Sequence, residues 1–302
     1  MRMLGLVLIL FGSGTGLLGQ TTMPVLRVLF LGNSLTDGNN VPGLVQAMAE
    51  LQGIRVEYTA VSPGGHALED HWNDNRQALL WDRHFDVLIL QQGPSTQPES
   101  QANLREWTRT WADEARRFGT APALYMVWPV RTQANGFSLV SQSYRNAALA
   151  ADAALFPAGD AWADVLRADS SLRLHSSDDL HATPAGSFLA AMVIARGLVA
   201  LEPDKVPLRL GGVTVPAETL ARFRTAVAAI EAHSYAETPS TSVPPTEPEP
   251  PSIRATTNPI PLGTPVMPAT GEAGGGGAPS GWFLVTLAAA AVMRMRRRIR
   301  RS

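Results

Sequence analysis

The sequence predicts an α/β fold in which a parallel sheet is covered by helices on both faces. Between residues 24 and 235, segments of strand character alternate with segments of helical periodicity, as successive βαβ crossovers require. Several strand segments are continuous apolar runs, which is typical of strands buried on both faces. The length of 302 residues suffices for one sizeable core, with chain left over at both ends.

Five segments have strand character, so we expect a sheet of about five strands. They are VLRVLFLG (25–32), IRVEYTAV (54–61), FDVLILQQ (85–92), PALYMVWP (122–129) and the short strand and loop of LFPAGDAW (155–162). Apolar spacing predicts helices over 41–53, 100–119, 138–154, 183–201 and 216–233. Gly53 and Gly119 end the first two helices, and Thr183 caps the fourth, with Pro184 in its first turn.

Polar and glycine-rich clusters mark the ends of the first three strands. Ser34 follows the first strand, GGHAL (64–68) follows the second, and QQG (91–93) ends the third. In open parallel sheets ligands bind beyond the carboxyl ends of the strands, so these clusters should meet at one edge. A fourth cluster, DDLH (178–181), stands just ahead of the long apolar helix.

Ser34, His181 and Asp178 are the residue types that nucleophilic catalysis by serine requires. Ser34 can attack, His181 can take its proton, and Asp178 can orient the imidazole from three residues away. A single serine after a strand is usually only a turn residue, so the interpretation depends on the whole set. Asp179 is the competing carboxylate, although its adjacent spacing suits solvent better.

The developing oxyanion also needs hydrogen-bond donors. The backbone N–H groups of Ser34 and Gly65 are candidates, because a bare glycine backbone lets substrate approach closely. A side-chain amide is the third candidate donor; we favour Gln92, with Gln91 as the second choice.

These motifs resemble those of the SGNH (GDSL-like) hydrolase superfamily over residues 25–200. GNSLTDGNN resembles its first block, with Asn33 where many members have Asp; GGHAL resembles its glycine block, and DDLH its final block. The usual Gly-x-Asn-Asp block is replaced by LQQGPS, which is similar to the branch that includes carbohydrate acetylesterases. The resemblance implies a flavodoxin-like three-layer α/β/α sandwich and ester hydrolysis without metal or cofactor.

Two further residues are expected to contact substrate. Asn33 stands beside the nucleophile, and Trp128 lies at the carboxyl end of a predicted strand, where it can line the pocket. The other histidines do not show the i, i+4 spacing of known zinc motifs, so we expect no metal site; they include His66, His71, His84 and His175.

The first 20 residues have the parts of a secretory signal peptide. One early arginine precedes the apolar run LGLVLILF, and small residues follow it. We expect cleavage near Gly19 or Gln20, which leaves 21–237 as the folded domain. Export to the bacterial cell envelope or surface follows from this interpretation.

The C-terminal part contains a linker and a second targeting segment. Residues 238–273 are rich in Pro and Thr and cannot form a packed core. Residues 274–302 combine glycines, a short apolar run and an arginine cluster, which resembles bacterial GlyGly-type sorting signals cut by a membrane protease. A simple membrane anchor is the alternative, although the run 282–293 would be only about 18 Å long as a helix.

Composition and charge limit the partners. The formal net charge is −1, and six arginines lie in the last nine residues, so the body is acidic and unsuited to binding nucleic acid. Because there is no cysteine, disulfides and thiolate metal sites are excluded. We therefore expect a monomeric, exported serine esterase that acts on glycan or lipid esters. The alternatives are a non-catalytic glycan-binding module on the same fold, and an acyltransferase.

Overall fold

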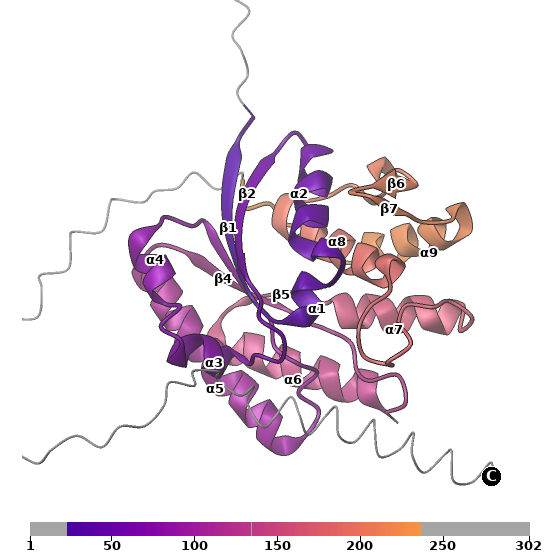
Figure 1. The fold of residues 1–302 in the computed structure, drawn as a ribbon. Coiled ribbons are helices and arrows are strands. Elements are labelled where there is room, and N and C mark those ends of the chain that lie inside the picture. The colour runs from indigo at the N-terminus through magenta and orange to yellow at the C-terminus, as the bar shows by residue number, and fades with distance from the viewer. Residues whose placement is uncertain (1–22, 134, 237–302) are drawn as a thin grey trace, which may run out of the picture.

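The apolar run after residue 24 becomes strand β1 (Val25–Leu31), the second strand of a parallel sheet (Figure 1). The computed structural model describes residues 23–133 and 135–236. Its five-stranded sheet has the order β2-β1-β3-β4-β5, with every neighbouring pair parallel. The other strands are β2 (Arg55–Val61), β3 (Val87–Leu90), β4 (Ala121–Tyr125) and β5 (Ala154–Phe156). The predicted parallel sheet is confirmed, although several strands are shorter than the segments predicted for them.

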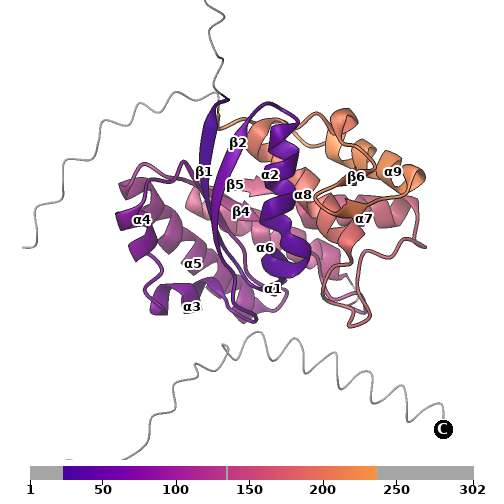
Figure 2. The ribbon, with the colours of Figure 1, turned by 45° about the horizontal axis from the view of Figure 1, so that its top comes forward.

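Helices cover both faces of the sheet, which confirms the three-layer sandwich. Helices α2 (Val41–Glu50) and α8 (Pro184–Val199) pack on one face, and α5 (Pro98–Arg117) and α6 (Gly136–Ala151) pack on the other (Figure 2). Helix α9 (Ala217–Ala228) packs against α7 (Ala158–Ala168) and α8. Helix α8 is buried along nearly its whole length, as its apolar sequence predicts.

Several short elements were not predicted. They are α1 (Ser34–Asp37), α3 (Leu68–Asn73), α4 (Ala78–Asp82), α7 (Ala158–Ala168), the 3₁₀ turns Gly38–Asn40 and Pro203–Lys205, and the hairpin of β6 (Arg209–Leu210) and β7 (Val213–Thr214). The predicted loop before residue 162 was wrong, because α7 begins directly after Pro157 and buries Ala161, Trp162 and Val165. The others span too few residues to show a period.

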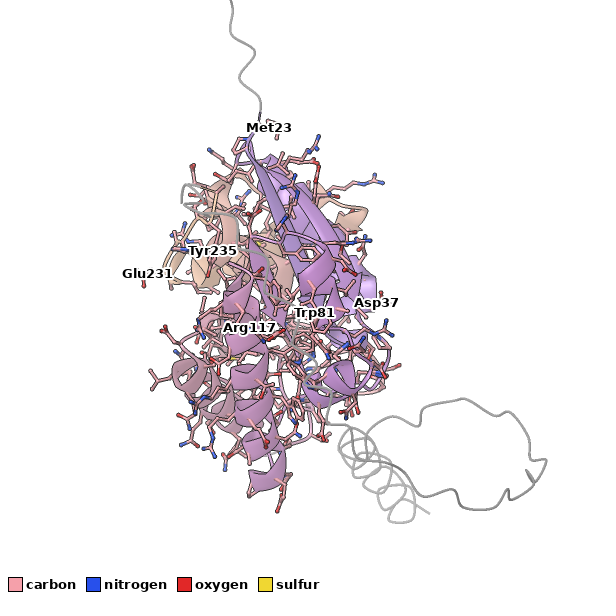
Figure 3. The ribbon with its side chains drawn as sticks, turned by 90° about the vertical axis from the view of Figure 1, so that its left-hand side faces the viewer. Met23, Asp37, Trp81, Arg117, Glu231 and Tyr235 are labelled. Carbon is pink, nitrogen blue, oxygen red and sulfur yellow. The ribbon has the colours of Figure 1, made fainter. Side chains whose placement is uncertain are left out.

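Helix α4 is held against α5 through one carboxylate. Glu114 accepts hydrogen bonds from the indole Nε1 of Trp81 and from Arg117, each at 2.8 Å. Figure 3 shows Trp81 and Arg117 close together on this side of the molecule. Trp81 therefore remains half exposed while its polar atom is satisfied.

The predictions for the two ends of the chain lie outside the described residues. They concern the signal peptide at 1–20, the linker at 238–273 and the tail at 274–302. Within residues 23–133 and 135–236, no helix has the length and apolar character needed to cross a membrane.

Candidate active site

Strand β1 delivers Ser34 to the carboxyl edge of the sheet through a tight turn. Ser34 is the first residue of α1 and is half-buried. At Gly32 the turn has no room for a side chain, because a Cβ there would lie 2.3 Å from the hydroxyl of Thr36 and 2.6 Å from Oε1 of Gln91. The side chain of Asn33 caps the helix by accepting from the N–H of Leu35. The turn therefore fixes where the serine hydroxyl lies.

The structure brings together the three residues predicted from the separate motifs. Nε2 of His181 lies 2.9 Å from Oγ of Ser34. On the other side of the ring, Nδ1 of His181 lies 2.5 Å from Oδ2 of Asp178. Since a carboxylate can only accept, Nδ1 carries the proton and Nε2 is free to accept from the serine hydroxyl. This is the arrangement in which an imidazole can act as a base toward a serine.

Asp178 is held in its charged form. Burial opposes its ionisation, but hydrogen bonds from the ring of His181, the N–H groups of Leu180 and His181 and the hydroxyl of Ser176 hold its pKa well below the usual range. Oδ1 accepts from the two N–H groups at 2.9 Å each and from Ser176 at 2.8 Å, which leaves Oδ2 for the imidazole. The carboxylate therefore stays ionised at neutral pH and keeps the ring in one orientation.

The loop that carries Asp178 and His181 is anchored by Arg131. The side chain of Arg131 forms an ion pair with Asp179. The backbone N–H of Arg131 also donates to the backbone carbonyl of Asp179, at 2.9 Å. Asp179 has a positive φ of 67°, which Asp tolerates better than most residues. This assigns the competing carboxylate, Asp179, to holding the loop.

The prediction that Trp128 lines the substrate pocket was wrong. Trp128 is fully buried, lies beyond the end of β4, and stacks on Trp162 with ring centroids 3.8 Å apart. Its indole N–H donates to the carbonyl of Leu180 at 2.8 Å. Trp128 therefore supports the loop of His181 and exposes no surface that a ligand could contact.

Asn39 connects the loop of Asp178 and His181 to the turn that carries Ser34 (residues 32–34, the serine turn). Nδ2 of Asn39 donates to the hydroxyl of Ser187 at 2.9 Å and to the carbonyl of Ala182 at 3.2 Å. Asn39 lies shortly after α1, whereas Ala182 follows His181 directly. The hydrogen bonds thus connect the two segments that must approach for Ser34 to meet His181.

The N–H of Ser34 is available to an oxyanion. The N–H groups of Thr36 and Asp37 donate to the carbonyl of Asn33, and that of Leu35 donates to its side chain. Among the described residues, the N–H of Ser34 has no acceptor, as expected at a helix start. The N–H of Gly65, whose φ is 81°, also has none within the described part of the chain.

The prediction that Asn33 contacts substrate was wrong. Asn33 is fully buried, and each of its side-chain atoms has a protein partner. Its Nδ2 donates to the carbonyl of His66 at 2.9 Å, while Oδ1 accepts from Leu35 and, at 3.1 Å, from the amide of Gln91. Asn33 therefore joins the serine turn to the loop that contains Gly64, Gly65 and His66, here named the glycine loop.

Both candidate glutamine amides are engaged by the protein. The Nε2 of Gln92 donates to Ser95 at 3.3 Å and to Asn103 at 3.2 Å. The Nε2 of Gln91 donates to Asn33, and also to the carbonyl of Gln92 at 2.6 Å. Gln91 thus stabilises the serine turn. An oxyanion role for Gln92 stays a prediction, and it requires one of the two hydrogen bonds that Nε2 of Gln92 donates to be redirected.

His71, which the sequence did not single out, also contacts the turn. Its Nε2 donates to the carbonyl of Gly32 at 2.7 Å from a fully buried position on α3. Burial lowers the pKa of His71 to about 4, although the bond to Gly32 opposes the shift. The one hint in the sequence was that His71 follows the glycine block closely.

Within residues 23–133 and 135–236, no group of three or more His, Asp or Glu side chains is arranged to hold a metal ion.

No protein-family model matches the sequence, and a search of curated proteins gave no match. Solved structures do resemble the chain. One is a DUF4886 family protein from Bacteroides uniformis, which is 17% identical and aligns over 67% of this chain and 93% of its own with a TM-score of 0.56. This similarity shows the fold.

Two other similar structures are described as hydrolases. A candidate SGNH hydrolase from Slackia heliotrinireducens is 28% identical, over 57% of this chain and 97% of its own, with a TM-score of 0.48. An acetyl xylan esterase, AlAXEase, is 16% identical, over 56% of this chain and 98% of its own, with a TM-score of 0.47.

Proposed function

We propose that this protein is an exported serine ester hydrolase with Ser34 as nucleophile, His181 as base and Asp178 as the orienting carboxylate. The observation that carries the proposal is the continuous chain of contacts from Asp178 Oδ2 through the imidazole to Ser34 Oγ. If Ser34 were only a turn residue and His181 only a surface residue, a continuous chain of contacts from Asp178 through His181 to Ser34 would not be expected. The sequence resemblance to SGNH hydrolases supports the same assignment.

In the proposed first half-reaction, Ser34 Oγ attacks the carbonyl carbon of an ester while Nε2 of His181 takes the hydroxyl proton. Asp178 stabilises the imidazolium that forms. The negative charge develops on the former carbonyl oxygen, which accepts from the N–H groups of Ser34 and Gly65. Collapse of the intermediate breaks the ester C–O bond, and His181 gives its proton to the leaving alcohol.

In the second half-reaction, water attacks the acyl group on Ser34 as His181 again takes a proton. The acid leaves, and the proton returns to Ser34 Oγ. The proposed substrates are glycan esters, such as acetylated carbohydrate, or lipid esters. The Gln-Gly pair at 92–93 supports the first class through its resemblance to carbohydrate acetylesterases. Export and attachment through the tail at 274–302 belong to the same proposal.

The test is an ester panel on residues 21–237, with p-nitrophenyl acetate, longer acyl esters and acetylated xylan. Ser34→Ala is the matched control, because it removes one oxygen and leaves the helix cap of Asn33 in place. Wild-type activity equal to that of Ser34→Ala would exclude the proposed chemistry.

A fluorophosphonate probe separates the hydrolase from the glycan-binding alternative. That alternative is motivated by the segment LQQGPS, which replaces the usual Gly-x-Asn-Asp block. The amides of both of its glutamines already donate to protein acceptors. Retention on a glycan column without covalent labelling of Ser34 would favour binding alone. Transfer of the acyl group to an added glycan acceptor would identify an acyltransferase.

A further inference from the structure

We propose that Asn33 and His71 are positioning residues that set the distance between the N–H groups of Ser34 and Gly65. The inference rests on the proposed function, in which these N–H groups bind the oxyanion. The two side chains link the same pair of segments, the serine turn and the segment formed by the glycine loop and α3, through separate hydrogen bonds.

The amide of Asn33 does what a carboxylate cannot do at this place. Its Oδ1 accepts two hydrogen bonds, from the N–H of Leu35 and from Gln91, and a carboxylate oxygen could accept both. Its Nδ2, however, donates to the carbonyl of His66 at 2.9 Å. An ionised Asp would direct an acceptor at that carbonyl, and the two oxygens would repel each other. Asn33, which directly precedes Ser34, is thus linked to His66, which directly follows Gly65.

His71 makes the second link in the opposite direction. Its Nε2 donates to the carbonyl of Gly32, so this donor comes from α3 and the acceptor from the serine turn. Its Nδ1 has no partner among the described residues, which fits a neutral ring protonated at Nε2. The lowered pKa, about 4, keeps the ring neutral at neutral pH, and the carbonyl of Gly32, which can only accept, selects the tautomer protonated at Nε2.

Two links constrain more than one. A single hydrogen bond would let the glycine loop pivot about its own axis, whereas bonds at His66 and at His71 fix its orientation against the serine turn. The N–H groups of Ser34 and Gly65 lie on the two segments so joined. Misplacing a reacting group by about 1 Å can cost on the order of 100-fold in rate. The links should therefore affect the chemical step more than substrate binding.

The first test is Asn33→Asp, measured with p-nitrophenyl acetate on residues 21–237. We expect kcat to fall roughly 10- to 100-fold with KM within about twofold of wild type, because the donors are displaced rather than removed. Phosphonylation of Ser34 by a fluorophosphonate should slow by a similar factor, since that adduct also needs the oxyanion donors.

The matched control is Asn40→Asp, which introduces the same charge in the same segment. Asn40 is exposed, and its Oδ1 caps α2 by accepting from Gly43, which a carboxylate can equally do. Its Nδ2 makes no hydrogen bond to the described residues. Wild-type kcat in this control is expected, and it would show that charge alone is not the cause.

The second test compares His71→Gln with His71→Phe. The Nε2 of Gln can donate to the carbonyl of Gly32, whereas Phe fills the space without a donor. We expect His71→Gln to keep at least about half of wild-type kcat and His71→Phe to lose roughly 10-fold or more. Equal kcat in the two variants would overturn the role of His71, and this pair decides the proposal if Asn33→Asp does not fold.

The outcomes separate this inference from the proposed function. If the wild type hydrolyses esters and Asn33→Asp matches it in kcat and labelling rate, the inference fails and the proposed function stands. If the wild type is no more active than Ser34→Ala, both fail. A rise in KM at constant kcat would also overturn the inference, because it would assign Asn33 to substrate binding.

Discussion

Nε2 of His181 lies 2.9 Å from Oγ of Ser34, although 147 positions separate the two residues in the chain. The contact depends on two segments that are far apart in the sequence, the turn after β1 and the loop before α8. Each piece is braced locally, and Asn39 joins them. The distance is therefore a property of the packed domain, and changes outside the reacting atoms should alter it.

Asp178→Asn should reduce kcat by roughly 10³- to 10⁴-fold while KM changes little. The amide can present N–H to Nδ1 of His181, which favours the tautomer that cannot accept from Ser34. Steady-state kinetics with p-nitrophenyl acetate measure the effect. Asp164→Asn is the control, since Asp164 makes an exposed ion pair with Arg167 on α7. Full activity in Asp178→Asn would contradict the assignment of the carboxylate.

Asn39→Asp should lower kcat by about 10-fold, because a carboxylate cannot donate to Ser187 or to the carbonyl of Ala182. Asp tolerates the left-handed conformation of residue 39, whose φ is 55°, so backbone strain is not introduced. Asn39→Gly removes the side chain and should give a similar loss without adding charge. If both variants keep wild-type kcat, the link does not set the distance between Ser34 and His181.

Trp128→Phe should lower both stability and kcat. The change removes the N–H bond to Leu180 and part of the stack on Trp162, and we expect a loss of about 1–3 kcal/mol in the free energy of unfolding. Urea unfolding and kinetics measure the two effects. Trp81→Phe makes the same chemical change at a half-exposed site and should leave kcat unaltered. A rise in KM without loss of stability would instead return Trp128 to the substrate pocket.

The sheet, and the meeting of Ser34, Asp178 and His181 in one place, could be predicted because their signals are local. Continuous apolar runs identify strands buried on both faces, and the crossover rule then brings their ends to one edge. Ser34 follows such a run directly, and Asp178 and His181 lie within one loop, so spacing alone relates them. These features need no knowledge of how distant segments pack.

The roles of Asn33 and Trp128 could not be predicted because they depend on distant partners. Trp128 donates to a carbonyl 52 positions away, and Asn33 accepts from a side chain 58 positions away. A backbone carbonyl has no sequence signature, so nothing marks Leu180 or His66 as an acceptor. The predicted length of β4 was wrong for a related reason. The apolar residues after Tyr125 are buried, but they belong to a loop and not to the strand.

The burial of His71 predicts a loss of stability as the pH falls below neutrality. Its folded-state pKa is lowered to about 4 by burial, which outweighs the opposing bond to Gly32 and the carboxylate of Asp70, while His66 and Arg76 add to the shift. In the unfolded chain His71 takes up a proton near its ordinary value, whereas the folded protein resists until about pH 4. Stability is therefore fully present above pH 6.5 and declines as the pH falls toward 4.

Between pH 7 and pH 5 the contribution of His71 amounts to about 2 kcal/mol. Urea unfolding at the two pH values measures it, and His71→Gln, which keeps a donor for Gly32 but does not titrate, should show a correspondingly smaller decline. Part of the decline should persist in the variant, because burial also lowers the pKa of His175. An identical pH dependence in wild type and His71→Gln would mean that the ring beneath Ser34 is hydrated and protonates freely.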